Sequence, residues 1–108
     1  MPVLIYGAGR AGKFLSQEIA SGDTIHDCRL LGFVDDNTSI RGTRVNGIIV
    51  RSPEDWLRLG PRFMGRERLP EVWISSRFVP DGKALDFARQ FEEPLSVKRQ
   101  VLSLQDVE

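Results

Sequence analysis

Cysteine, histidine and tyrosine each occur only once in this chain of 108 residues. A single cysteine, Cys28, excludes an internal disulfide, and with only His26 beside it the chain cannot assemble a zinc site. Small scaffolds held together by disulfides or by zinc are thereby excluded. We expect a reducing compartment, with Cys28 as a small residue near a loop.

The chain also lacks long apolar runs and an excess of charge of either sign. No apolar segment approaches the roughly 18 residues needed to cross a bilayer, and no signal-peptide pattern precedes Val3. Fifteen basic residues balance fifteen acidic ones, which removes the positive footprint of a nucleic-acid-binding protein. We therefore predict no membrane span in this segment and no nucleic acid among the partners.

The remaining composition is that of an ordinary globular domain. Hydrophobic residues make up 41% of the chain and charged residues 28%, close to the averages for folded proteins. The length suits one domain, which we predict to cover residues 1–108. Because a strand pattern begins almost at the first residue, we expect this domain to be excised from a larger protein.

Short apolar runs bounded by turn residues recur along the chain and predict strands. Their continuous pattern, rather than an alternating one, is typical of strands covered on both faces of a parallel sheet. The predicted strands lie at residues 3–6, 29–34, 48–50, 72–74 and within 95–104.

Three stretches with apolar residues at helical spacing separate these strands. In the first, the sheet-facing residues are Ala11, Phe14, Leu15 and Ile19, and the solvent-facing ones are Ser16, Gln17 and Glu18. The second begins at Ser52 and Pro53, which suit a helix cap and the first helical turn. The third spans roughly residues 80–91 and ends before Pro94.

Strands that alternate with helices in this way predict a parallel sheet, because each connection must cross one face of the sheet. The fold class is therefore α/β: a doubly wound, Rossmann-like parallel sheet of about five strands with helices on both faces. With the strand order 3-2-1-4-5, the chain reverses direction beside the first strand. A crevice then opens at the carboxyl edge, where such sheets bind ligands.

A glycine-rich loop occupies that crevice. It runs Gly7-Ala8-Gly9-Arg10-Ala11-Gly12, a G-x-G-x-x-G pattern between a predicted strand and a predicted helix. Gly7 permits the tight turn, Gly9 allows close approach of a pyrophosphate, and Gly12 allows the helix to pack against the strand. The amides at the start of the helix would then face the anion. A loop that only packs the helix onto the sheet is the alternative.

The second strand ends at an acidic pair, Asp35-Asp36, about 20 residues beyond the loop. A carboxylate in that position hydrogen-bonds the ribose of an adenosine and repels a 2′-phosphate, which favours NAD over NADP. Arg41 and Arg44 follow closely enough to offset this repulsion, so NADP stays the less favoured alternative. Ser75 and Ser76 end the fourth strand and form the other wall of the crevice.

Catalytic residues are missing from this pattern. Tyr6 lies inside the first strand without the lysine of a Tyr-x-x-x-Lys pair, and His26 falls at the opposite edge of the sheet. There is no Cys/His pair and no nucleophile elbow. We therefore predict a domain that holds a nucleotide without performing chemistry on it.

Three segments resemble a known family: residues 3–12, the run Leu31-Gly32-Phe33-Val34-Asp35-Asp36-Asn37, and residues 41–50. The chain is similar to the nucleotide-binding domain of bacterial membrane-associated polysaccharide-biosynthesis proteins. These include the CapD-like nucleoside-diphosphate-sugar dehydratases and epimerases, and membrane sugar-phosphate transferases fused to a similar domain. The resemblance implies a module of a larger, membrane-anchored protein at the cytoplasmic face of the bacterial inner membrane, whose partners are the other domains of its parent chain.

The predicted function is therefore that of a non-catalytic domain binding NAD or a related dinucleotide. One alternative is part of a nucleotide-sugar dehydratase, epimerase or oxidoreductase acting on UDP-sugars. Another is an interaction or homodimerisation module with a vestigial site. No catalytic or metal-binding residue is predicted, and the candidate cofactor-binding residues are Gly7, Ala8, Gly9, Arg10, Ala11, Gly12, Asp35, Asp36, Ser75 and Ser76.

Overall fold

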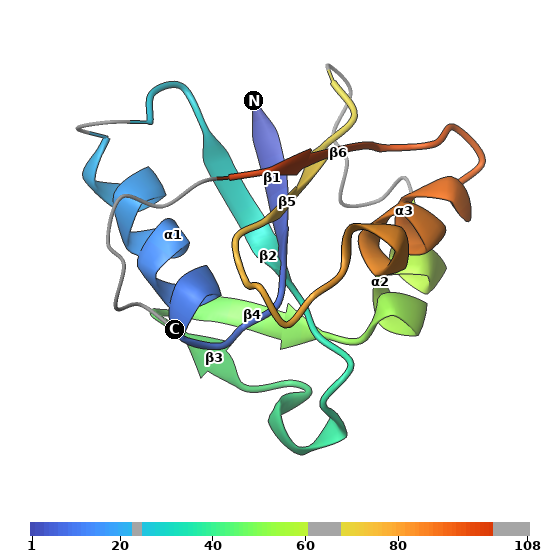
Figure 1. Cartoon of the computed structure of the whole chain (residues 1–108), viewed down its shortest axis with the longest axis horizontal. Helices are drawn as coiled ribbons and strands as arrows, with labels where there is room; N and C mark the ends of the chain where they lie inside the picture. Colours follow the sequence, from blue (N-terminus) through green and yellow to red (C-terminus); the bar gives the residue numbers. More distant parts are fainter. Residues whose placement is uncertain (23–24, 61–67, 101–108) are drawn as a thin grey trace.

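A computed structural model of the chain describes residues 1–22, 25–60 and 68–100. In these ranges the fold is α/β, with a six-stranded, mostly parallel sheet and three α-helices (Figure 1). The strands are β1 (Pro2–Tyr6), β2 (Arg29–Val34), β3 (Arg44–Val45), β4 (Ile48–Arg51), β5 (Glu71–Ile74) and β6 (Ser96–Arg99). The helices are α1 (Arg10–Ser21), α2 (Pro53–Leu59) and α3 (Asp81–Arg89), with a short 3-10 helix, η1, at Thr38–Ile40.

The sheet has the order β3-β4-β2-β1-β5-β6. Its five parallel strands, β4-β2-β1-β5-β6, follow the predicted order and positions. The last of them is β6, and residues 101–104 of the predicted segment lie outside the described ranges. Because β1 sits between β2 and β5, the segments that follow these three strands are neighbours at the carboxyl edge.

The antiparallel strand β3 was not predicted. It pairs with β4 through a two-residue turn formed by Asn46 and Gly47, whose φ angles are 52° and 79°. Positive φ at both positions is what a tight hairpin turn requires, and the Asn-Gly pair is its strongest sequence signal. The connection between β2 and β4 therefore contains this hairpin. The sequence pattern predicts no helix there, and the structure, which describes this whole connection, has no α-helix between these two strands.

Helices cover both faces of the sheet, as the pattern predicts. On one face α1 packs Leu15 and Ile19 against a cluster that includes Val3, Ile5 and Phe33. The other face carries α2 and α3, whose apolar residues join a cluster with Leu4, Tyr6, Val34, Val72 and Ile74. Figure 1 shows α1 on one side and α2 with α3 on the other. No α-helix in the described ranges is both long and apolar enough to cross a bilayer.

Ser16 is buried, with 4% of its surface exposed, although the helical pattern predicts that it faces solvent. The β3–β4 hairpin explains the difference. Asn46 in its turn donates a hydrogen bond from Nδ2 to the Ser16 hydroxyl at 3.1 Å, and that hydroxyl donates to the carbonyl of Lys13 at 2.6 Å. The turn of this hairpin thus covers the part of α1 around Ser16.

Gly32 allows α2 to pack closely on β2. A Cβ at this position would overlap the six-membered ring of Trp56. The indole Nε1–H of Trp56 donates to the carbonyl of Phe33 at 2.8 Å, so the buried ring also satisfies its polar atom. Ser52 caps this helix as predicted, because its hydroxyl accepts a hydrogen bond from the amide of Asp55 at 3.1 Å.

Candidate functional site

Two of the three loop glycines are required by the fold. Gly7 has a φ of +103°, and a Cβ there would come within 3.2 Å of Cγ2 of Val79. A Cβ on Gly12 would overlap the carbonyl oxygen of Gly7, so α1 can pack against the end of β1 only without a side chain there. Both positions therefore have the structural roles that the sequence predicts.

Gly9 differs from these two glycines. Its φ of −81° and ψ of −158° are accessible to any residue, and no described heavy atom lies within 4 Å of a Cβ built there. Gly9 is also the N-cap of α1, where its carbonyl accepts the first helical hydrogen bond from Lys13 at 2.9 Å. No side chain caps this end of the helix. The absent side chain leaves open space beside the amides at the start of α1.

Arg10, Ala11 and Ala8 complete the loop. Arg10 is exposed, whereas Ala11 and Ala8 are buried against the sheet with 1% and 9% of their surfaces exposed. The loop is held to β2 because the amide of Gly7 donates to the carbonyl of Val34 at 2.7 Å. It is therefore a fixed turn at the carboxyl edge.

Asp35 lies at the glycine loop, where the sequence predicts it. Its Oδ2 accepts a hydrogen bond from the amide of Ala8 at 2.8 Å, and its Oδ1 accepts one from the amide of Asn37, also at 2.8 Å. The Ala8 amide is thus satisfied by the acid itself. A carboxylate offers about four acceptor positions, so each oxygen of Asp35 can still accept a hydrogen bond from a hydroxyl group.

Asp36 belongs to a separate polar group on the α3 side of the sheet. Its Oδ1 accepts from the hydroxyl of Tyr6 at 3.0 Å, and Lys83 Nζ lies 2.8 Å from its Oδ2. Burial, followed by the charge of Asp36, raises the pKa of Tyr6 well above its usual value. The hydrogen bond to Asp36 raises the pKa of Lys83. Sequence reasoning missed Lys83, because no local pattern links α3 to the end of β2.

Ser75 and Ser76 begin the loop between β5 and α3, which lies against the glycine loop. Cβ of Ser76 is 3.7 Å from a Cβ built on Gly7, and its hydroxyl accepts a hydrogen bond from the amide of Phe78 at 3.1 Å. Oγ of Ser75 is buried and has no hydrogen-bond partner among the described residues. Both serines thus follow β5 at the carboxyl edge, as predicted, and Ser76 lies beside the glycine loop.

Arg99 of β6 fixes this connection, and nothing in the sequence pattern singles it out. Its guanidinium donates to the carbonyl of Ser76 at 3.0 Å, to the carbonyl of Val79 at 2.6 Å and to Asp81 Oδ1 at 2.7 Å. Three hydrogen bonds from one side chain hold the segment from β5 to the start of α3 in a single arrangement.

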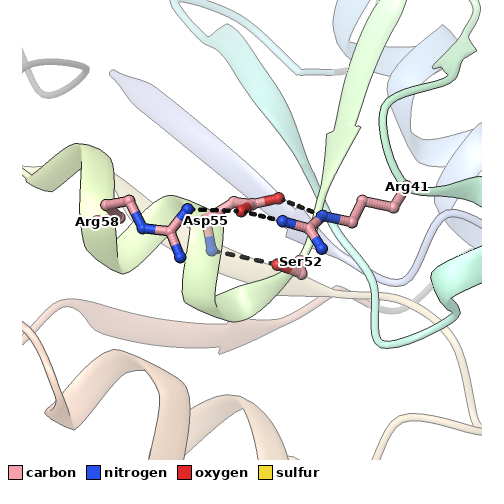
Figure 2. Close-up of polar contacts among 4 residues, drawn as sticks. All are labelled: Arg41, Ser52, Asp55 and Arg58. Carbon is pink, nitrogen blue, oxygen red and sulfur yellow. Dashed lines mark hydrogen bonds and ion pairs between the residues drawn. The ribbon is translucent and has the colours of Figure 1, made fainter.

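Arg41 forms an ion pair with Asp55 instead of lying at the glycine loop. Its Nε and Nη2 donate to the two carboxylate oxygens at 2.7 and 2.6 Å, and Arg58 Nη1 lies 3.6 Å from Oδ1 of the same acid (Figure 2). Hydrogen bonds from Arg41 lower the pKa of Asp55, with a further contribution from Ser52. Figure 2 shows the two arginines reaching Asp55 from opposite sides.

A surface hollow of about 380 Å³ lies beside this ion pair. Its lining residues are Asp36, Thr38, Arg41, Ser52, Pro53, Glu54 and Arg58. The hollow thus lies beyond the end of β2, at Asp36, and its lining contains no residue of the glycine loop. In the described ranges, no group of three or more histidine, cysteine or acidic residues is arranged to hold a metal ion.

Comparison with known proteins adds no family assignment: no protein-family model matches the sequence, and no curated protein matches it.

Proposed function

We propose that this chain is a non-catalytic domain of the doubly wound, Rossmann-like type that binds NAD at the carboxyl edge of its sheet. The contrast among the three loop glycines carries this proposal. Packing within the protein accounts for Gly7 and Gly12, whereas no described atom lies close enough to require glycine at position 9. The open space at Gly9 adjoins the amino-terminal end of α1, which no side chain caps and whose helix dipole favours a phosphate group.

Asp35 supplies the second part of the site. Its remaining acceptor positions suit the hydroxyl groups of a ribose, and two backbone amides hold the carboxylate in place. A negative charge here disfavours a 2′-phosphate. Arg41 is one of the two arginines that could have offset this repulsion, but it forms a bidentate ion pair with Asp55. Both observations favour NAD over NADP as the ligand.

The buried position of Tyr6 supports the non-catalytic part of the proposal. A tyrosine that acts as a proton donor or acceptor needs a pKa closer to neutrality, but burial and Asp36 move the pKa of Tyr6 in the opposite direction. The resemblance to CapD-like proteins supports a place in surface-polysaccharide synthesis, at the cytoplasmic face of the bacterial inner membrane. The other domains of a parent chain would then be the partners.

Replacement of Gly9 tests the proposal. Calorimetric titration of the full chain with NAD should show binding, and a ligand at 100 times its dissociation constant should stabilise the fold by about 2.7 kcal/mol. Gly9→Val should abolish binding and leave the chain folded, because its Cβ meets no described atom within 4 Å; the poorer N-cap that valine makes should cost at most about 1 kcal/mol. Gly82→Val is the matched control, since Gly82 is also unconfined, and it should bind NAD normally.

One observation favours a second candidate, an interaction module with a vestigial site. Both oxygens of Asp35 already accept hydrogen bonds from the chain's own amides, which is what a purely structural acid would do. In that case the wild-type chain would bind neither NAD nor NADP. A concentration-dependent dimer, measured by analytical ultracentrifugation, would then be the informative result.

A further inference from the structure

Phe78 is a large hydrophobic side chain in an unusual position. It is 75% exposed, the one exposed large hydrophobic residue in the described part of the chain. It lies in the connection between β5 and α3, which crosses the carboxyl edge of the sheet (Figure 1). Isolated exposed apolar residues are common on protein surfaces, so its exposure matters only if the backbone holds it there and the site lies beside it.

The backbone does hold Phe78 in place. Its amide donates to the hydroxyl of Ser76 at 3.1 Å, and the amide of Val79 donates to the carbonyl of Ser76 at 3.3 Å. The guanidinium of Arg99 donates hydrogen bonds to the carbonyls of Ser76 and Val79, on either side of Phe78. The exposed ring therefore belongs to a tightly bonded turn rather than to a loose loop.

The same turn contacts the glycine loop. Ser76 and Val79, which flank Phe78, are the residues that a side chain on Gly7 would meet, at 3.7 and 3.2 Å. Asp35 follows β2, which lies on the opposite side of β1 from β5. Since neighbouring strands are about 4.8 Å apart, the ends of β2 and β5 are separated by roughly 10 Å. A ligand with a sugar on each side of a diphosphate can reach both.

Arg77 adds to this surface. Its guanidinium lies over the ring of Phe78, with Cζ 5.1 Å from the ring centroid. This contact favours a defined ring orientation, and the side chain still remains 75% exposed. A flat, exposed ring held beside a phosphate-binding loop is suited to stacking against a planar heterocycle.

We infer that Phe78 stacks against the second heterocycle of the bound dinucleotide, the one on the β5 side of the loop, and thereby selects dinucleotides over ligands with a single base. This inference rests on the proposed nucleotide-binding function and adds a specificity-determining residue to it. Asp35 would bind the ribose on the β2 side, and Phe78 would stack against the ring at the other end of the ligand.

Calorimetric titration with two ligands tests the inference. The ligands are NAD and ADP-ribose, which has the diphosphate and both sugars of NAD but lacks the nicotinamide ring. Phe78→Ala should weaken binding of NAD about tenfold, in the lower part of the range for aromatic–base stacking, and should change ADP-ribose affinity less than twofold. Phe78→Tyr keeps a ring and should retain the affinity for NAD. Gln17→Ala, an exposed substitution on α1, serves as the control.

The two failures are distinguishable. If the wild-type chain binds NAD and Phe78→Ala weakens NAD and ADP-ribose equally, or weakens neither, the stacking role is wrong and the nucleotide-binding function survives. Equal wild-type affinity for NAD and ADP-ribose overturns the stacking role in the same way. If the wild-type chain binds neither ligand, the proposed function itself fails. Ligand-free thermal unfolding of each variant shows whether a loss of binding comes from unfolding.

Discussion

The carboxylate of Asp35 accepts a hydrogen bond from the backbone amide of Ala8 at 2.8 Å, which ties the end of β2 to the glycine loop after β1. A second amide, from Asn37, meets the other carboxylate oxygen at the same distance. Two backbone donors converging on one acid orient it and fix the loop. The residue proposed to read a ribose therefore also stabilises the turn that would hold the phosphates.

Asp35→Asn should destabilise the fold. An asparagine keeps one acceptor oxygen, but its amide group would face one of the two backbone donors, which would lose its partner. We expect a loss of about 1–2 kcal/mol, measured by urea unfolding. Asp86→Asn is the control, because Asp86 is exposed on α3. Equal stability of the two variants would show that the hydrogen bonds of Asp35 do not support the fold.

Gly12→Ala and Gly82→Ala should differ in their effects on stability, although both residues lie in helices. The new methyl group at position 12 would overlap the carbonyl of Gly7, so α1 must shift, with a loss of about 1–3 kcal/mol. Position 82 is open, and alanine there should be neutral or stabilise the helix by up to about 1 kcal/mol. Thermal unfolding of the two variants side by side measures the difference. A Gly12→Ala variant as stable as wild type would contradict the close packing of α1.

Hydrophobic pattern and motif predicted much of this structure, because both depend on local spacing. The positions of the five parallel strands and the capped start of α2 follow from residues close together in sequence, whereas the strand order and the place of Asp35 came from the fold type that these elements indicate. The Asn46-Gly47 hairpin could also have been predicted, since the dipeptide itself specifies the turn. Its omission led to the wrong expectation that Ser16 faces solvent.

Other parts of the site arise only from the folded topology. Lys83 meets Asp36, and Arg99 binds the segment after β5, because the sheet order brings distant segments together. No spacing in the sequence connects these residues. The donors that reach Asp35 belong to the backbone, and a sequence pattern of side chains does not reveal them.

The pair formed by Arg41 and Asp55 should make stability depend on pH in the acid range. Folding lowers the pKa of Asp55, so its contribution is complete above the unfolded value of about 3.9 and is lost as the pH falls through the folded value. Because Arg41 is half exposed, we expect the effect to be small. Urea midpoints measured from pH 5 to pH 2.5 should fall less steeply in Arg41→Ala than in wild type. Parallel curves would show that the pair does not contribute.

Tyr6 should resist ionisation until the protein unfolds. It is the only tyrosine in the chain, so tyrosinate absorbance near 295 nm reports this residue alone. Burial and the adjacent Asp36 raise the pKa of Tyr6, whereas an unfolded tyrosine ionises near pH 10. Stability should therefore be intact below about pH 10 and fall as the pH rises further, with tyrosinate appearing together with the loss of far-ultraviolet circular dichroism. Asp36→Asn should shift the ionisation to lower pH by removing the neighbouring charge. A tyrosine that titrates near pH 10 in the folded wild-type chain would show that Tyr6 is not buried against Asp36.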